Sequence, residues 1–206
     1  MKATVLCRAA IFALMAVAVP AGAMAARIPE KCREAWQANH WCEAGQVGYI
    51  AGVEIRSKFL FEVLDAHGHD IEPSAVTCEV CRKAIENDGY CPAHRMGYVA
   101  GKAYLSSLTY LVAKGRTIDP ASISCDTCRR NSQGIGWCEK HRVGMAGPVA
   151  IEDRRAFGEF EDAYRILLKA VEASARCETC AGAIVNDGYC PTHRIHYKNG
   201  EAVSPR

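Results

Sequence analysis

One pattern of cysteines and histidines occurs three times in this chain and constrains its fold more than any other feature. Two cysteines separated by two residues are followed, after nine more residues, by a cysteine and a histidine that are again separated by two residues. The three copies are Cys78, Cys81, Cys91 and His94; Cys125, Cys128, Cys138 and His141; and Cys177, Cys180, Cys190 and His193. An arginine follows each histidine, and the intervals contain no insertion. The chain is therefore predicted to be a tandem repeat.

A fourth, degenerate copy precedes these three. Cys32 and Cys42 keep the interval of nine residues, but Pro29 and Gly45 stand where the first cysteine and the histidine are expected. Equivalent cysteines of successive copies are 49, 47 and 52 residues apart. Units of this size bury little apolar surface alone, so we expect each to need a metal ion, a disulfide or stacked neighbours.

The first residues have the layout of a secretory signal peptide. Lys2 and Arg8 form a short basic start, an apolar run covers residues 9–19, and Ala-Met-Ala at residues 23–25 forms a cleavage signal. We expect residues 1–25 to be removed and the mature chain to be periplasmic or secreted through a Sec-type route. No later segment is long and apolar enough for a membrane span, so none is expected after signal removal.

The charge balance argues against a nucleic-acid partner. Residues 1–25 contain two basic residues and no acidic ones, so the mature chain carries 23 residues of each sign. Nucleic-acid binding depends on a clustered basic surface, which a neutral balance does not offer.

The repeated spacing is typical of a structural zinc site. Two residues between ligands allow both to reach one ion from a single turn, and Cys3His is a standard tetrahedral ligand set. We predict three zinc ions per chain, one in each full copy. We expect the Cys-x2-His pair to open a helix, where free amides favour the thiolate form. With its cysteine pair, tight turn and helix-borne second pair, each copy resembles a treble-clef zinc finger, and no specific protein family is recognised.

The remaining cysteines suggest a disulfide. The mature chain has eleven cysteines, of which the three predicted sites use nine. We predict that the other two, Cys32 and Cys42, are bridged, as an oxidising compartment permits. Alternatives are an all-disulfide scaffold, an iron–sulfur cluster, a softer metal, or an open metal site of Cys32, His40 and Cys42. His67 and His69 are interpreted as residues of a solvated loop, although a weak metal site there is conceivable.

The predicted fold is a small α+β repeat of metal-stapled knuckle or hairpin plus helix modules, mostly helical between the metal sites. The expected divisions are 26–75, a degenerate metal-free repeat with a helix, and three Cys3His modules at 76–122, 123–175 and 176–206. An apolar stripe predicts a long helix at residues 154–174. Helices are also expected within 47–64 and 96–113, with small residues allowing close helix contacts, and Pro148 is expected to delay the helix that follows it.

Function is less constrained than chemistry. No nucleophile elbow, phosphate loop or catalytic carboxylate pair is recognisable, so we expect the chain not to be an enzyme. The favoured hypothesis is a zinc-stapled scaffold or protein-interaction module whose partner is another envelope protein. The alternatives are a metal buffering or delivery protein, and a thiol redox or iron–sulfur electron-transfer protein.

Overall fold

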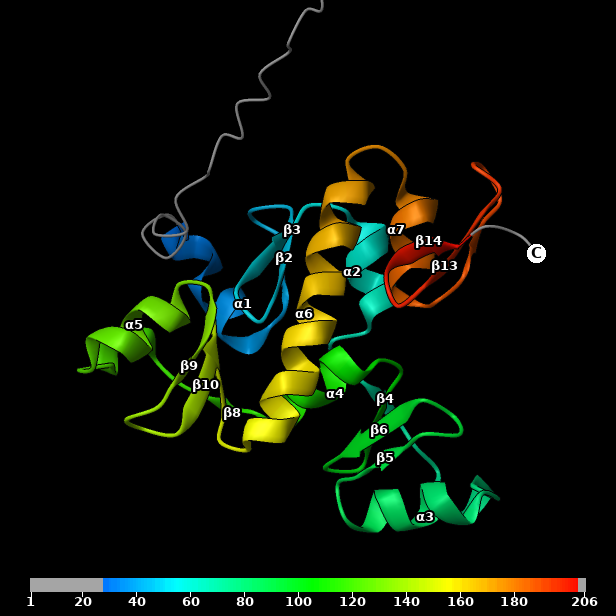
Figure 1. The fold of residues 1–206 in the computed structure, drawn as a ribbon, viewed down its shortest axis with the longest axis horizontal. Helices are drawn as coiled ribbons and strands as arrows, with labels where there is room; N and C mark the ends of the chain where they lie inside the picture. Colours follow the sequence, from blue (N-terminus) through cyan, green and yellow to red (C-terminus); the bar gives the residue numbers. More distant parts are fainter. Residues whose placement is uncertain (1–27, 204–206) are drawn as a thin grey trace, which may run out of the picture.

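The computed structural model describes residues 28–203, so the predicted signal peptide lies outside the described residues. Four small antiparallel sheets lie around a set of central helices (Figure 1). The predicted class is confirmed: the chain is a small α+β protein of repeated hairpin and helix units, each full copy carrying a Cys3His cluster. Among residues 28–203, no helix combines the length and the apolar character needed to cross a bilayer.

The four repeats share one order of elements: a short helix, a strand that ends at a cysteine, and a hairpin. The first repeat contains η2 (Glu30–Cys32), α1 (Arg33–Ala38), β1 (Trp41–Cys42), β2 (Val47–Ile50), β3 (Val53–Ile55) and α2 (Lys58–Leu64). Module 1 contains α3 (Glu79–Glu86), β5 (Tyr90–Cys91), β6 (Met96–Val99), β7 (Lys102–Tyr104) and α4 (Ser107–Lys114). Module 2 contains α5 (Asp126–Ser132), β9 (Ile135–Cys138), β10 (Val143–Ala146), β11 (Val149–Ile151) and α6 (Arg154–Ser174). Module 3 contains α7 (Glu178–Val185), β12 (Tyr189–Cys190), β13 (Ile195–Lys198) and β14 (Glu201–Val203).

Short linker elements join the repeats. The strand β4 (His69–Asp70) pairs with β7, and β8 (Arg116–Thr117) pairs with β11, which gives the two middle sheets a fourth strand. The short helices η3 (Pro73–Ala75) and η4 (Pro120–Ser122) then lead into the first cysteines of modules 1 and 2. Each linker therefore extends the sheet of the module that follows it.

The long helix was predicted correctly, and two others were not. The helix α6 spans Arg154–Ser174, as the apolar stripe indicated. The segments 47–64 and 96–113 instead begin with hairpins and become helical only at Lys58 and Ser107. Ala51-Gly52 and Ala100-Gly101 occupy hairpin turns with positive φ at both residues, which is the type I′ combination. The small residues thus shape turns and strands rather than helix contacts.

The second helix begins at a fixed position in each of the first three repeats. Its N-cap is Ser57, Ser106 or Asp153, and each of these side chains accepts a hydrogen bond from an amide three residues later. The helix following Pro148 starts thirteen residues after His141, the same interval that separates α4 from His94. The expected delay was wrong because Pro148 lies in the turn between β10 and β11.

An aromatic residue of this second helix packs on a glycine of the hairpin. The rings are Phe61, Tyr110 and Phe157, and a Cβ atom built at the glycine below each ring (Gly48, Gly97 and Gly144) would overlap with it. Each ring also lies 5.6 Å, centroid to centroid, from an aromatic residue on the strand that ends at a cysteine: Trp41, Tyr90 or Trp137. The close approach of helix and sheet therefore requires glycine at this strand position.

Module 3 has no second helix among the described residues, and its hairpin differs accordingly. His196 occupies the position that is glycine in the other repeats, opposite Tyr189 in the strand pairing. The two rings lie 4.5 Å apart between centroids. His196 therefore covers the aromatic residue that a helix ring covers elsewhere.

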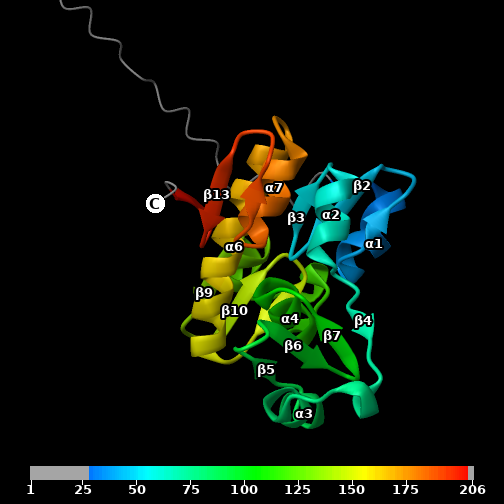
Figure 2. The same cartoon turned by 90° about the vertical axis from the view of Figure 1, so that its right-hand side faces the viewer.

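The main core lies between the second helices. The helix α6 contacts α7, α4 and α2, and Figure 2 shows the hairpins arranged outside these helices. Phe157, Phe160 and Leu167 of α6 are fully buried in this core. Separate, smaller apolar clusters lie beneath the cysteines of each repeat. The four cysteine-bearing parts are thus peripheral units attached to one helical core.

Candidate metal centres

The structure brings the predicted ligands together in three separate clusters. In each cluster one ligand atom from each of the four side chains lies within 4.8 Å of the others. The clusters are Cys78, Cys81, Cys91 and His94 (site 1); Cys125, Cys128, Cys138 and His141 (site 2); and Cys177, Cys180, Cys190 and His193 (site 3). Within residues 28–203, no fourth group of three or more metal-binding side chains converges in this way.

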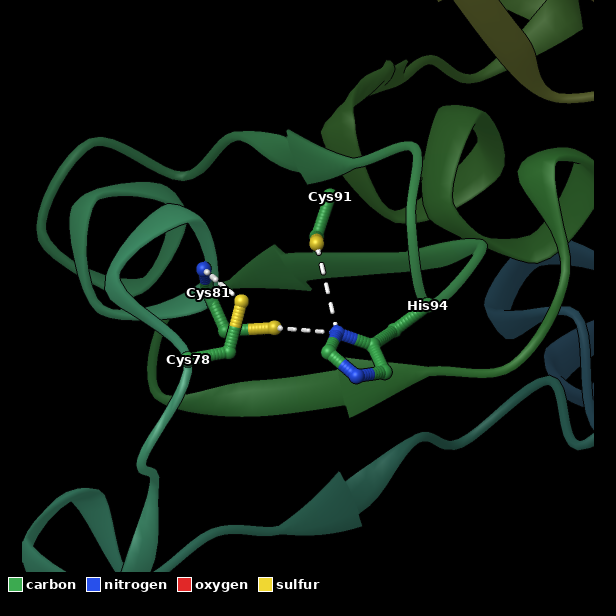
Figure 3. A group of neighbouring side chains, drawn as sticks. All are labelled: Cys78, Cys81, Cys91 and His94. Atoms are coloured by element: carbon green, nitrogen blue, oxygen red, sulfur yellow. Dashed lines mark hydrogen bonds between the residues drawn. The ribbon is translucent and has the colours of Figure 1, made fainter.

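The two halves of each site come from different elements. Figure 3 shows Cys78 and Cys81 projecting from the start of α3, whereas Cys91 is the last residue of β5 and His94 lies in the turn between β5 and β6. Cys78, Cys125 and Cys177 are the N-caps of their helices. The expectation that the Cys-x2-His pair opens a helix was therefore wrong, because the Cys-x2-Cys pair does so. The helix begins at the first pair of ligands and not at the second, so the structure does not confirm the resemblance to a treble clef.

The distances between ligand atoms match a tetrahedral ion. In site 1 the Nδ1 atom of His94 lies 3.2 Å from the Cys81 sulfur and 3.5 Å from the Cys91 sulfur. The corresponding distances are 3.3 and 3.5 Å in site 2, and 3.1 and 3.7 Å in site 3. Zinc bond lengths of about 2.3 Å to sulfur and about 2.0 Å to nitrogen imply a sulfur–nitrogen edge of about 3.5 Å. The sulfur–nitrogen distances in the three sites, 3.1–3.7 Å, are close to this edge.

Each site has an inner and an outer side. The second and third cysteines are buried, at 2 % and 0 % exposure for Cys81 and Cys91, whereas Cys78 is half-buried. The three histidines, His94, His141 and His193, are exposed. A bound ion would be held from below by buried sulfur and reached by solvent from its histidine side.

The helix start favours thiolate at the first cysteine of each site. The amide of Cys81 donates to the Cys78 sulfur at 3.5 Å, and this hydrogen bond lowers the pKa of Cys78. The corresponding amide of Cys128 lowers the pKa of Cys125 to about 6. Burial has the opposite effect on the inner cysteines and raises the pKa of Cys81 to about 11. A divalent cation supplies the positive charge that buried thiolates require.

The arginine that follows each histidine has a backbone role. Arg95, Arg142 and Arg194 have φ values of 54°, 51° and 56°, so each closes the knuckle in the left-handed region. Arg95 also forms an ion pair with Asp187 of module 3, at 3.1 Å. Among residues 28–203, no hydrogen bond joins these guanidinium groups to a cysteine sulfur.

The degenerate repeat has a disulfide in place of a metal cluster. Cys32 and Cys42 are bonded, with their Cα atoms 5.4 Å apart, as predicted. An open site of Cys32, His40 and Cys42 is therefore excluded, because both sulfurs are already bonded. The ring of His40 instead packs against the ring of His67, at 4.3 Å between centroids. His69 lies 3.0 Å from the carboxylate of Asp65, apart from this pair.

Sequence reasoning missed two tyrosines beside the sites. Tyr98 is buried in the same cluster as Cys81 and Cys91, and Tyr197 packs against the cluster that contains Cys180 and Cys190. The recurrence of tyrosine seven residues after Cys91 and after Cys190 was the available signal. Because residues 47–64 and 96–113 were expected to be helical, their small residues were interpreted as positions of close helix contact.

Comparison with protein-family models, curated proteins and solved structures found no match for this chain.

Proposed function

We propose that this protein is a zinc-binding scaffold of the periplasm or cell exterior, in which three zinc ions staple small modules to a helical core. The observation that carries this proposal is the convergence of three cysteines and one histidine in each of three sites. Four protein donors complete a tetrahedron, whereas catalytic zinc keeps a position open for water. Zinc is favoured over an iron–sulfur cluster because the chain is expected to cross the membrane unfolded and to acquire its metal outside.

The composition of the local cores supports a structural role for the ions. The cluster beneath site 1 has five buried members, Cys81, Ala84, Cys91, Tyr98 and Ala103, and two of them are candidate ligands. A core this small cannot hold α3 to its hairpin. Zinc binding contributes about 10–16 kcal/mol in zinc-finger peptides, which matches or exceeds the total stability of about 5–15 kcal/mol of a typical domain.

The disulfide supports the proposed location. A disulfide forms and persists in oxidising compartments. Nine other cysteines of the same described chain are unpaired, and six of these are buried within the three clusters. Bound ions would protect these thiolates from oxidation beside the Cys32–Cys42 bridge. The export signal proposed at residues 1–25 agrees with this location.

A metal buffering or delivery protein is the second candidate, and one observation favours it. The histidine of every site is exposed and the first cysteine is half-buried, so an acceptor could reach the ion. The two functions differ in how the protein responds to metal removal.

Hydrogen exchange before and after chelation separates the two candidates. For a scaffold, chelation removes protection from the amides of α3 and α5, which pack mainly on their own hairpins, and leaves α6 protected. For a buffer, metal leaves while α3 and α5 keep their protection. Full protection of both helices without metal would refute the structural role.

A further inference from the structure

Two histidines lie in contact in the repeat that has no Cys3His cluster. His40 lies in the connection between α1 and β1, and His67 lies in the loop between α2 and β4. Their ring centroids are 4.3 Å apart, and the ring planes cross at 79°. Both side chains are exposed, so solvent reaches the pair.

His40 stands at a position where the other repeats have no side chain. It precedes Cys42 by two residues, and the equivalent residue of the three full modules is glycine: Gly89, Gly136 and Gly188. The backbone is equivalent, because the carbonyl of His40 accepts a hydrogen bond from the amide of Tyr49 as that of Gly89 does from Tyr98. An imidazole at this position is therefore specific to the degenerate repeat.

His67 belongs to a connection that is longer in this repeat. Residues 65–68 separate α2 from β4, whereas Gly115 alone separates α4 from β8. The longer loop places the His67 ring against His40 and 6.0 Å, centroid to centroid, from the ring of Phe61. Two changes in the same repeat thus bring two imidazoles together.

The ring nitrogens of this pair are free to bind a ligand. The rings of His69 and of the three site histidines have polar partners, whereas within residues 28–203 no hydrogen bond or ion pair engages the ring of His40 or His67. Burial, followed by the charge of His67, lowers the pKa of His40, so this ring is mainly neutral at pH 7. Neutral imidazole is the form that binds metal ions.

The separation of the two rings is close to that of two imidazoles on one ion. A metal–nitrogen bond of about 2.0–2.1 Å puts each ring centroid about 3.2 Å from the ion, so rings bound at a right angle have centroids about 4.5 Å apart. A tetrahedral angle requires about 5.2 Å. The observed 4.3 Å is closer to the right angle of square-planar or tetragonal ions such as copper(II) and nickel(II).

The charges beside the pair favour a cation. His67 lines a cavity of about 270 Å³ whose wall also carries the carboxylates of Glu43, Glu62 and Asp65, against the single ammonium group of Lys58. An excess of negative charge around a hollow raises the local concentration of cations.

We propose that His40 and His67 form a fourth metal site, specific to the degenerate repeat, for a divalent transition-metal cation that prefers square-planar or tetragonal coordination. Water completes the coordination of this ion, so the site is open, unlike the three Cys3His sites. The inference does not rest on the proposed zinc-binding function, because the two kinds of site share no residue.

Titration of the zinc-loaded full chain with nickel(II), which does not oxidise cysteine thiolates, tests this site. Isothermal titration calorimetry should show one nickel ion bound per chain while the zinc content stays unchanged. The second imidazole binds an ion that the first already holds, so the pair should bind nickel about 100-fold more tightly than a single histidine does. Absence of stoichiometric binding, or binding only with release of zinc, would overturn the inference.

Single substitutions identify the ligands. His40→Gln and His67→Gln should each lower the affinity for nickel about 100-fold, and because both side chains are exposed the fold should be retained. His69→Gln and His196→Gln are the matched controls, since each removes an exposed imidazole outside the pair and should leave the affinity unchanged. Amide NMR verifies that each variant is folded. Equal affinity in all four variants would assign nickel to adventitious surface binding and contradict the site.

Discussion

The guanidinium group of Arg95 lies 3.1 Å from the carboxylate of Asp187, and this ion pair joins the knuckle of site 1 to module 3. Asp187 also accepts a hydrogen bond from the amide of Asn199, which fixes the carboxylate on its own hairpin. The side chain of Asp187 is 19 % exposed and that of Arg95 is 60 % exposed. The contact therefore connects two metal modules that are far apart in sequence.

Replacement of Arg95 should weaken this connection only modestly. Arg95→Ala is expected to lower the free energy of unfolding by about 0.2–1 kcal/mol, because the guanidinium group is largely solvated. Arg142→Ala is the matched control, since among residues 28–203 no ion pair involves Arg142. A double-mutant cycle with Asp187→Asn measures the coupling by denaturant unfolding. Equal losses in both arginine variants, with no coupling, would contradict a link between the modules.

The glycine beneath Phe157 should tolerate no side chain. Gly144→Ala is expected to destabilise the protein by about 1–3 kcal/mol, because the added methyl group overlaps with the Phe157 ring and the helix must shift. Gly158→Ala, in α6 itself, is the control, because nothing lies within 4 Å of a Cβ atom added there. This control should stabilise α6 by about 0.5–1 kcal/mol. Thermal unfolding of the two variants should therefore shift in opposite directions.

The cysteine spacing and the apolar stripe of α6 gave the correct predictions from the sequence. The cysteine spacing predicted the three clusters, because ligands two residues apart can reach one ion from a single turn. The Cys32–Cys42 bridge was predicted because these two cysteines remained after the three clusters were assigned. The stripe on α6 also predicted its helix, because Phe157, Phe160 and Leu167 all face one core.

Hairpins were predicted as part of each module, but those within 47–64 and 96–113 were expected to be helical because their strands are largely buried. Val47–Ile50 and Val143–Ala146 show no polar alternation, so they look like the start of the buried helix that follows. The turn residues were the better signal. Asn199-Gly200 is a strong type I′ hairpin pair, and its equivalents Ala51-Gly52 and Ala100-Gly101 take the same positive φ values. Which cysteine pair begins a helix could not be read from the identical spacing of the two pairs.

Acid should destabilise the first repeat through His40. Burial, followed by the charge of His67, lowers the pKa of His40 below 6.5. The native state therefore binds this proton less readily than the unfolded state, so stability is lost as pH falls below 6.5 and through the lowered pKa. His40→Gln should reduce this loss, measured by urea unfolding at a series of pH values with NMR signals of the first repeat as the probe. His69→Gln, at the exposed contact with Asp65, is the control. An unchanged pH dependence in His40→Gln would contradict this assignment.

The disulfide should stabilise the first repeat independently of metal. Paired Cys32→Ala and Cys42→Ala substitutions are expected to cost about 2–4 kcal/mol, because the unfolded loop is no longer constrained. Metal content should remain unchanged, since neither cysteine belongs to the three clusters. Calorimetric unfolding combined with metal analysis of the double variant checks both outcomes. Loss of metal from the double variant would show that the metal sites depend on the bridge, contrary to this prediction.

The most direct test of the three proposed zinc sites is a combined metal and thiol analysis of protein purified from the periplasm or cell exterior, its proposed location. We predict about three zinc ions per chain, one disulfide between Cys32 and Cys42, and nine cysteines that react with thiol reagents only after chelation. The solution should have no visible colour. Metal-free protein in which these nine cysteines are oxidised to cystine would contradict metal binding altogether, and a brown, iron-containing protein would contradict the assignment of zinc.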